Sequence, residues 1–396
     1  MPWKETDKMD QRTKFAQEAM HTDSLSALCR EYGISRPTGY KWITRYKALG
    51  ASGMEDQSRA PKQNKNALSE NIVCEIVLLK RSHSKWGPAK IRELYRRKHK
   101  DKELPSESSF KRVLNKSGLT KKRRKRIAST NNSRLNSGAI ATKANDIWTI
   151  DFKGWWRDSN GSKVEPFTVR DEYSRKILEV KLLKSSKTEA VQACFEQLFK
   201  RYGLPKMIRS DNGSPFASSR GLLGLSRLSA WWLALGISLE RGRPGCPQDN
   251  GAHERMHLDI YRELQCEGVG FNQPAFDLWK KEYNEVRPHS SLGMQTPNEV
   301  YTKSDIRYKG TPEELSYPSM DQRKVHKNHG TIRLENESYM LSSSLGGWHV
   351  GIKSVSKTIS EIWFSHLLIG HIDHAQRAFK PIAENLRVTG TNKKTV

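Results

Sequence analysis

The order of apolar runs between residues 146 and 264 constrains the fold of this chain more than any other feature. Strand-like runs separated by turn-like segments come first, at 146–152, 166–171 and 177–183. Helical and strand-like runs then alternate, at 188–202, 206–210, 223–235, 237–240 and 251–264. Three successive strands followed by alternating helices and strands predict a layered α/β domain, with the first strand in the middle of the sheet.

Three acidic residues fall at the ends of these elements. Asp151 lies near the end of the first strand, Asp211 directly follows the fourth, and Glu254 lies in the first turn of the last helix. In this order, which is that of an RNase H-like layer, the fold can bring the two aspartates together. Proteins use carboxylates to hold two divalent cations roughly 3.5–4 Å apart across a scissile phosphate. The sequence therefore predicts an Asp-Asp-Glu triad, with Asp151, Asp211 and Glu254 as catalytic and metal-binding residues.

Basic and imidazole side chains flank the predicted glutamate, and we expect them to contact DNA phosphates near the scissile bond. They are Arg241, Arg243, His253, Arg255 and His257. A surface or packing role is the alternative for the two histidines.

Two further acids and two tryptophan pairs have simpler explanations. Asp171 is expected to fix a hairpin turn, and Asp249 to cap the helix that carries Glu254. The pairs at 155–156 and 231–232 are expected in the core, with stacking on unpaired bases as the alternative.

The positive charge is concentrated at the front of the chain. The formal net charge is +26, and residues 1–150 carry 33 Lys and Arg against 15 Asp and Glu. Residues 151–300 carry 22 against 19, and residues 301–396 carry 14 against 9. Such a concentrated surplus indicates nucleic-acid binding, because each neutralised phosphate releases counterions. We therefore expect the front of the chain to hold double-stranded DNA and the middle to carry out the chemistry.

Residues 10–50 have the spacing of a helix-turn-helix unit. Ser24 and Ser35 can cap the second and third helices, and Gly33 supplies the turn between them. The third helix would pack Ile34, Ile43 and Tyr46 inward. Its side chains expected in the major groove are Arg36, Thr38, Lys41 and Arg45. A small helical bundle with a solvated basic face is the alternative.

A second helical set follows a stretch of small, polar residues at 51–68, which predicts a linker. Apolar residues at helical spacing occur in 68–81, 88–98 and 106–116, an order that suits a second, winged helix-turn-helix. A six-residue basic run comes next and is expected to follow a phosphate backbone, although a solvated tail is the alternative. It consists of Lys121, Lys122, Arg123, Arg124, Lys125 and Arg126.

After residue 310, short alternating or apolar runs between Gly, Ser and Asn turns predict a small β-barrel of about five strands. The five cysteines include no C-x-x-C pair and no zinc spacing, so we expect reduced, mostly buried thiols. No apolar run is long enough to span a membrane, and no apolar signal segment follows Met1. A cytoplasmic, nucleoid-associated location is therefore expected.

The overall prediction is a multidomain chain with N-terminal all-α domains, an α/β core and a C-terminal β domain. The expected boundaries are a helix-turn-helix domain at 1–55, a linker at 56–68, a second helical domain at 69–120, a basic linker at 121–145, a catalytic core at 146–305, a β-barrel at 306–385 and a polar tail at 386–396.

These residues resemble a known family. Its most specific elements here are the runs at 210–216 and 242–257, and the later run at 283–292 with Thr296-Pro297. The chain resembles bacterial insertion-sequence transposases with a retroviral-integrase-type core, and most closely those of insertion-sequence family 481. The family's acidic triad falls on Asp151, Asp211 and Glu254. The interval of 43 positions between the last two exceeds that of the commonest integrase pattern, and the extra residues lie within 219–232.

The resemblance implies a DNA transposase that binds the terminal inverted repeats of its element through the front domains. It also implies multimers on DNA, and cleavage and 3′-hydroxyl strand transfer with two Mg²⁺ or Mn²⁺ ions per site. An RNase H-like nuclease without strand transfer is one alternative, although a simple nuclease does not need the flanking domains. A non-catalytic DNA-binding regulator is another, although all three carboxylates are present.

Overall fold

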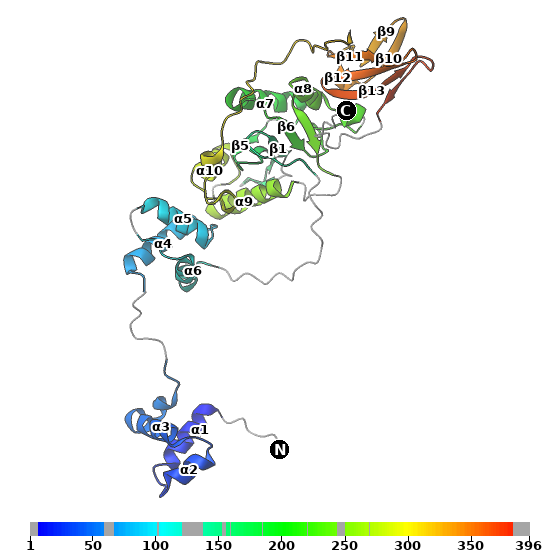
Figure 1. Cartoon of the computed structure of the whole chain (residues 1–396). Coiled ribbons are helices and arrows are strands. Elements are labelled where there is room, and N and C mark those ends of the chain that lie inside the picture. Colours follow the sequence, from blue (N-terminus) through cyan, green and yellow to red (C-terminus); the bar gives the residue numbers. More distant parts are fainter. Residues whose placement is uncertain are drawn as a thin grey trace. The chain divides into compact units, whose positions relative to one another are not determined.

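The computed structural model describes residues 7–58, 67–100, 103–120, 138–152, 156–158, 160–183, 185–219, 221–243, 250–268 and 270–382. The chain divides into two compact units, Met1–Ser69 and Glu70–Val396. Figure 1 labels their elements along the chain. No helix within the described residues is long and apolar enough to cross a membrane.

The first unit is a three-helix bundle closed by a short 3₁₀ helix. Its elements are α1 (Lys8–Glu18), α2 (Leu25–Glu31), α3 (Arg36–Leu49) and η1 (Gly50–Met54). Gly33 has a φ of +63°, and the Ser35 hydroxyl accepts a hydrogen bond from Thr38 N (3.4 Å), so the predicted turn and the Ser35 cap are confirmed. Ser24 stands at the N-cap of α2 but makes no side-chain capping hydrogen bond, so that part of the prediction is wrong. Met54 is fully buried with Phe15. The core of this unit therefore includes the start of the polar stretch 51–68 and ends within the domain predicted at 1–55.

Three further helices open the second unit: α4 (Glu70–Ser82), α5 (Pro88–Lys98) and α6 (Glu107–Lys116). Pro88 occupies the first position of α5, and the Ser106 hydroxyl caps α6 by accepting from Ser109 N (3.2 Å). The predicted helices are therefore confirmed. Within the described residues between 67 and 120 there is no strand, so the predicted wing has no counterpart there.

The central sheet has the strand order β5-β4-β1-β6-β7. Its strands are β1 (Ile147–Phe152), β4 (Pro166–Asp171), β5 (Ile177–Leu182), β6 (Met207–Ser210) and β7 (Ser238–Arg241). β1 pairs antiparallel with β4 and parallel with β6, so it is the middle strand, as predicted. A two-stranded hairpin, β2 (Trp156–Arg157) with β3 (Lys163–Val164), lies between β1 and β4 in the sequence.

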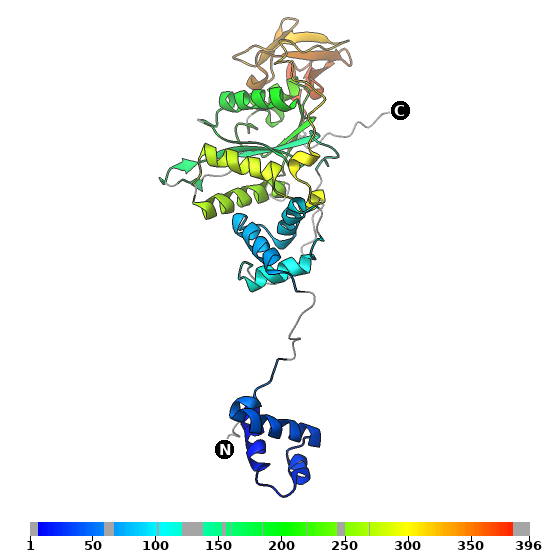
Figure 2. The same ribbon diagram turned by 90° about the vertical axis from the view of Figure 1, so that its left-hand side faces the viewer.

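Helices cover both faces of this sheet (Figures 1 and 2). Those on one face are α7 (Thr188–Tyr202) and α8 (Arg227–Ala234), and those on the other are α9 (Gly251–Glu267) and α10 (Gln273–Glu285). Phe195 and Trp232 belong to the first helix layer and share a core with Trp148 of β1. Met256 and Ile260 of α9 pack with Ile177 of β5 in a second core. The sheet is therefore buried on both sides and holds its strands in a fixed register.

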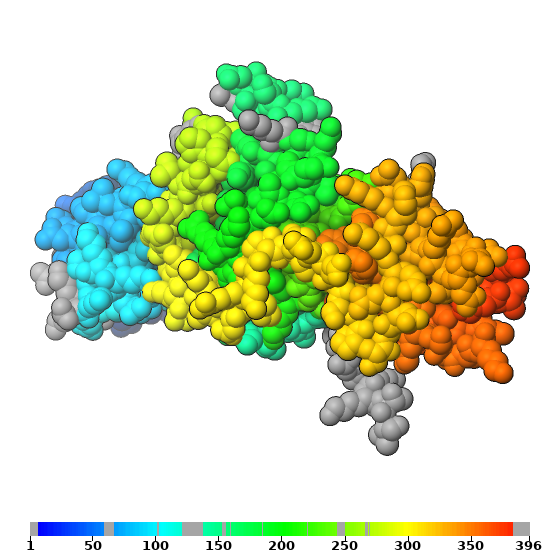
Figure 3. All heavy atoms as spheres, turned by 90° about the horizontal axis from the view of Figure 1, so that it is seen from above, coloured from blue at the N-terminus to red at the C-terminus, as the bar shows by residue number. Residues whose placement is uncertain are grey.

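The C-terminal region is an antiparallel sheet with the strand order β14-β13-β12-β11-β8, beside a hairpin of two strands. The strands are β8 (Asp321–Lys324), β9 (Thr331–Leu334), β10 (Glu337–Met340), β11 (His349–Ser354), β12 (Ile359–Phe364), β13 (Leu367–Asp373) and β14 (Ala378–Pro381). Figure 3 shows this region against the α/β core. β8 and β14 are the outer strands and do not pair with each other in the described part of the chain. A β-rich domain is therefore present. Within the described residues, the pairing of its strands does not close into a barrel.

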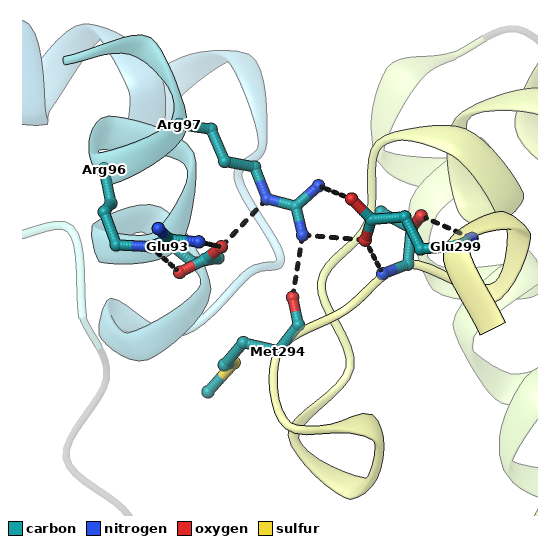
Figure 4. Close-up of polar contacts among 6 residues, drawn as sticks. Glu93, Arg96, Arg97, Met294 and Glu299 are labelled. Carbon is teal, nitrogen blue, oxygen red and sulfur yellow. Dashed lines mark hydrogen bonds and ion pairs between the residues drawn. The ribbon is translucent and has the colours of Figure 1, made fainter. Parts of the chain in front are cut away.

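Ion pairs and hydrogen bonds hold α4–α6 against the rest of the second unit. Arg97 of α5 donates to both carboxylate oxygens of Glu299 (3.0 Å each) and to the Met294 carbonyl (2.9 Å), as Figure 4 shows. Glu299 belongs to the short helix α11 (Pro297–Val300). His83 Nδ1 lies 2.9 Å from Glu282 Oε1 of α10. The second helical set is therefore built onto the α/β layer.

Candidate active site

The parallel pairing of β1 with β6 places two of the predicted catalytic acids at one edge of the sheet. Trp148 is level with Ile208, and Thr149 with Arg209. Two residues further along each strand, Asp151 and Asp211 stand at the same level, because parallel strands advance together. The two aspartates are thus brought together as predicted, and the Asp151 side chain keeps 21% of its surface exposed.

Local hydrogen bonds shape the turn after β6. Gly213 N donates to Asp211 Oδ1 (3.1 Å), and Asn212 Nδ2 donates to the carbonyl of Gly242, just beyond β7 (2.8 Å). A Cβ added at Gly213 would lie 3.1 Å from Asp211 Oδ2, so glycine leaves room for this carboxylate. The turn therefore fixes the direction in which the chain carries Asp211 away from the sheet.

Glu254 is exposed in the first turn of α9, and it is the third predicted ligand. Hard carboxylate oxygens suit a divalent cation, so the chemistry of Asp151 and Asp211 fits the predicted metal. However, the described residues contain no group of three or more His, Cys, Asp and Glu side chains placed to hold a metal ion. The structure therefore brings together the aspartate pair, but it does not gather the whole triad around one point.

His253 and His257 do not face solvent, and the predicted phosphate contacts of these two side chains are wrong for that reason. Their exposed fractions are 0% and 1%. Both imidazoles point to Thr168 of β4, with His253 Nε2 and His257 Nε2 at 2.6 and 2.8 Å from its hydroxyl oxygen. Burial holds the pKa of His253 well below its usual range, so this imidazole is neutral. The packing alternative is the one that the structure supports.

The arginines near Glu254 differ in their surroundings. Arg255 is largely exposed, and its Nε donates to Asp259 one turn later on α9 (3.1 Å). Arg241 donates to the Leu223 carbonyl (3.1 Å), and burial lowers the pKa of its guanidinium. Arg243 is half-buried. Arg255 is thus the flanking arginine most open to a phosphate, whereas Arg241 supports a turn of the protein.

The predicted DNA-reading residues lie on α3 of the first unit. Arg36 and Lys41 are exposed, and Thr38 is half-buried. The Arg45 guanidinium lies 5.1 Å from the centre of the Trp42 ring and donates to Gln57 (3.1 Å). Arg45 is therefore engaged within its own unit, and Arg36 and Lys41 are the more accessible cations of this helix.

Several other predictions can be followed in the structure. Asp171 is buried and accepts bonds from Ser174 N, Ser174 Oγ and Asn145 N (2.8, 2.6 and 2.7 Å), which confirms its role in the turn. Trp156, Trp231 and Trp232 are buried in the cores, as expected by default. Of the three cysteines whose side chains are described, Cys29 and Cys194 are buried and Cys74 is exposed. The basic run 121–126, Trp155 and Asp249 lie outside the described residues.

The sequence-based interpretation missed two groups of residues. Thr149 and Thr168 were not singled out, although they join α9 to the sheet. Arg287 was not singled out either, although it donates to Asp259 (2.8 Å) and Glu263 (2.9 Å) of α9. A signal for the histidines was present, because His253, His257, Ile260 and Leu264 follow a helical period that also describes the buried face of α9.

Family models match both the α/β layer and the helices that precede it. Residues 141–247 and 235–297 match models described as an integrase core domain. Residues 11–62 match a helix-turn-helix domain, and residues 38–114 match a homeodomain-like domain. The chain therefore carries an integrase core domain behind helix-turn-helix domains.

Proteins of bacterial insertion elements are among its relatives. An uncharacterized 31.7 kDa protein of element IS407 from Burkholderia multivorans is 24% identical over 59% of this chain and 82% of its own length. A 39.2 kDa protein of element IS476 from Xanthomonas euvesicatoria is 25% identical over 58% of this chain and 64% of its own length. These matches confirm the resemblance to bacterial insertion-sequence transposases with an integrase-type core. The narrower assignment to family 481 stays a prediction.

Among solved structures, the catalytic core domain of BIV integrase is similar to this chain. It is 26% identical, with a TM-score of 0.32, and the similarity covers 40% of this chain and 93% of that domain.

Proposed function

We propose that this chain is a DNA transposase that binds the terminal inverted repeats of its element and cuts and joins DNA. The observation that carries the proposal is the parallel register of β1 and β6 in an integrase core domain, which places Asp151 on β1 level with Asp211 directly after β6. Aspartates that only form turns at strand ends need not lie at the same level of the sheet, whereas two aspartates that share a cation must do so.

Asp151, Asp211 and Glu254 are the residues proposed to hold two divalent cations, Mg²⁺ or Mn²⁺. When bound, such cations make water or a 3′-hydroxyl nucleophilic near neutral pH and stabilise the leaving 3′ oxygen. The two aspartates would provide ligands from the rigid edge of the sheet. Glu254 would provide its ligand from the first turn of α9, and its exposed side chain would turn toward the aspartates when DNA and cations bind, because the described residues do not place all three together.

The flanking residues would bind the DNA. Arg36, Thr38, Lys41 and Arg45 of α3 are proposed to read the terminal repeat, with Arg36 and Lys41 exposed for that purpose. Lys121–Arg126, Arg241, Arg243 and Arg255 are proposed phosphate contacts, of which Arg255 is the most exposed in the described structure. Two copies or more would hold the two ends of one element, and the C-terminal sheet would support the same complex.

A strand-transfer assay tests this function. Full-length protein is incubated with Mg²⁺ and a duplex carrying the inverted repeat found beside its gene. We expect a nick at the repeat end and joined products, whereas Asp151→Asn, Asp211→Asn and Glu254→Gln should abolish both and retain DNA binding. Asp305→Asn, which changes an exposed acid of the same unit, is the matched control and should behave as wild type.

The same assay separates the alternatives. Nicking without joined products would support an RNase H-like nuclease. Binding without either product would support a DNA-binding regulator. Full activity of Asp211→Asn would contradict the assignment of the active site.

A further inference from the structure

A buried polar network connects α9 to the sheet directly behind the aspartate pair. The Thr168 hydroxyl oxygen lies 2.6 Å from His253 Nε2 and 2.8 Å from His257 Nε2. The same hydroxyl lies 3.0 Å from the backbone carbonyl of Asp151. On the other side of the His253 ring, Nδ1 lies 3.0 Å from the Thr149 hydroxyl. Two strands and one helix thus share a single set of hydrogen bonds.

The number of protons available on the hydroxyls and imidazoles shows that these hydrogen bonds depend on one another. The Thr149 hydroxyl donates to the Arg170 carbonyl (3.3 Å), so it accepts from His253 Nδ1–H. His253 Nε2 then carries a lone pair, and both it and the Asp151 carbonyl oxygen face the single proton of the Thr168 hydroxyl. Because that hydroxyl has one proton, its oxygen accepts from His257 Nε2–H. Loss of the Thr168 hydroxyl would leave polar groups of both imidazoles unpaired in a buried place.

The network reaches the carboxylate of Asp151 itself. His257 Nδ1 lies 3.7 Å from Asp151 Oδ2, and the His257 side chain is 1% exposed. The Trp156 ring packs edge-on against the His257 imidazole, with ring centres 6.5 Å apart. The His257 imidazole therefore lies between the Trp156 ring, the Thr168 hydroxyl and the Asp151 carboxylate.

The same network also fixes the position of Glu254. His253 and His257 are four residues apart, so they lie on the face of α9 that contacts the sheet. Glu254 directly follows His253 and is exposed. Since His253 bonds to side chains of β1 and β4, the helical turn that carries Glu254 cannot shift along the sheet without breaking these bonds.

We propose that His253, His257 and Thr168 are positioning residues that hold the Asp151 carboxylate and the Glu254 turn at a set separation for divalent-cation binding. This inference rests on the proposed function, because it assigns a purpose to residues behind its active site. His257 contributes through its ring, with Nε2–H donating to Thr168 and Nδ1 lying 3.7 Å from Asp151 Oδ2, so that the ring limits where the carboxylate can move. Groups that orient metal ligands in this way typically change metal affinity by about 10–100-fold when they are lost.

Direct measurement of Mn²⁺ binding to the full chain, by the electron paramagnetic resonance signal of free Mn²⁺, tests the inference. Thr168→Val removes the hydroxyl and keeps the shape, and it should weaken Mn²⁺ binding about tenfold or more. Thr168→Ser restores the hydroxyl and should recover most of the affinity. The control is Ser360→Ala, which breaks a similar hydroxyl–imidazole bond to His374 (2.9 Å) in the C-terminal sheet and should leave Mn²⁺ binding unchanged.

Two substitutions of His257 each keep one of its two contacts, with Thr168 or with Asp151. They test the inference if Thr168→Val does not fold. His257→Asn places an amide near the position of Nδ1 and retains the contact to Asp151. His257→Gln places its amide near the position of Nε2 and retains the contact to Thr168. We expect His257→Asn to bind Mn²⁺ more tightly than His257→Gln, because the carboxylate contact is the one that serves the cation.

The outcomes separate the inference from the function on which it rests. Wild-type Mn²⁺ affinity in both Thr168→Val and His257→Gln would overturn the positioning role while leaving the proposed transposase intact. An equal loss in Ser360→Ala would also overturn it, because the effect would then be general destabilisation. Absence of Mn²⁺ binding and of cleavage in the wild-type protein would contradict the proposed function itself.

Discussion

The two helical sets at the front of the chain have similar sequence patterns and different structural status. The first set, α1–α3, has its own core around Phe15, Trp42 and Met54 and forms a separate compact unit. The second set, α4–α6, belongs to the same compact unit as the α/β layer. Its Trp86 is 3% exposed and lies 5.8 Å from the Arg287 guanidinium of the layer. A helical set therefore forms its own compact unit when its aromatic side chains pack within the set, and joins a larger unit when they pack against that unit.

Among the substitutions that test this comparison, two matched tryptophan substitutions are expected to change the unfolding free energy most. Trp42→Ala and Trp86→Ala each remove a buried indole, which costs about 3–5 kcal/mol of unfolding free energy. Trp42→Ala should increase hydrogen exchange only in residues 7–54, because that ring packs within the first unit. Trp86→Ala should increase exchange in α4–α6 and also in α10. Exchange confined to α4–α6 in Trp86→Ala would mean that the second set is as independent as the first.

Arg287→Lys should have the next largest effect. The Arg287 guanidinium is buried and donates three bonds to Asp259 and Glu263 of α9, which a lysine cannot reproduce. We expect a loss of about 2 kcal/mol in the unfolding free energy of the second unit. The control is Arg12→Lys, whose guanidinium lies over Trp42 and pairs with the exposed Asp56 (3.0 Å). Urea unfolding monitored by exchange should show a smaller loss there, limited to the first unit.

The pH dependence of stability should reveal the contact between α5 and the layer. Burial, with Arg287 and Arg255 nearby, lowers the pKa of Lys90 to about 8, although Asp259 and Glu263 oppose this shift. Between pH 8 and the ordinary lysine value near 10.4, the unfolded chain binds more protons than the folded one, so Lys90 makes stability rise with pH. Lys90→Met should remove about 1–2 kcal/mol of that rise. Identical pH profiles for Lys90→Met and wild type would mean that Lys90 is solvated.

The ion pair of Arg97 with Glu299 should give the smallest effect. Its side chains keep 28% and 45% of their surface exposed, so water screens the attraction. A double-mutant cycle of Arg97→Ala and Glu299→Ala should yield a coupling of about 0.5–1 kcal/mol. Because Glu93 also contacts Arg97, Glu93→Ala serves as the reference for loss within α5 alone. A coupling near zero would assign the attachment of α4–α6 to ring packing.

The sequence predicted the elements well because each depends on local patterns. The meander of β1, β4 and β5 and the helix that carries Glu254 follow from apolar periodicity, and the Ser35 cap follows from residue type. The level placement of Asp151 and Asp211 follows from the predicted topology. The direction of His253 and His257 was indicated by the helical period that they share with Ile260 and Leu264, but histidine as a residue type is compatible with either face and the period was not used. The Arg97–Glu299 pair could not be predicted, since its residues are far apart in the sequence and resemble ordinary surface charges.

The long interval between the second aspartate and the glutamate contains a helix that belongs to two cores at once. Trp231 and Trp232 of α8 pack with β1 and α7, whereas Ala230 and Leu233 pack with the strands of the C-terminal sheet. A substitution on one side of α8 is therefore expected to change the packing of both domains. Substitutions on either side of α8 must therefore be compatible with the same helix, so exchange of the α/β layer or of the C-terminal sheet between relatives requires an α8 that fits both cores.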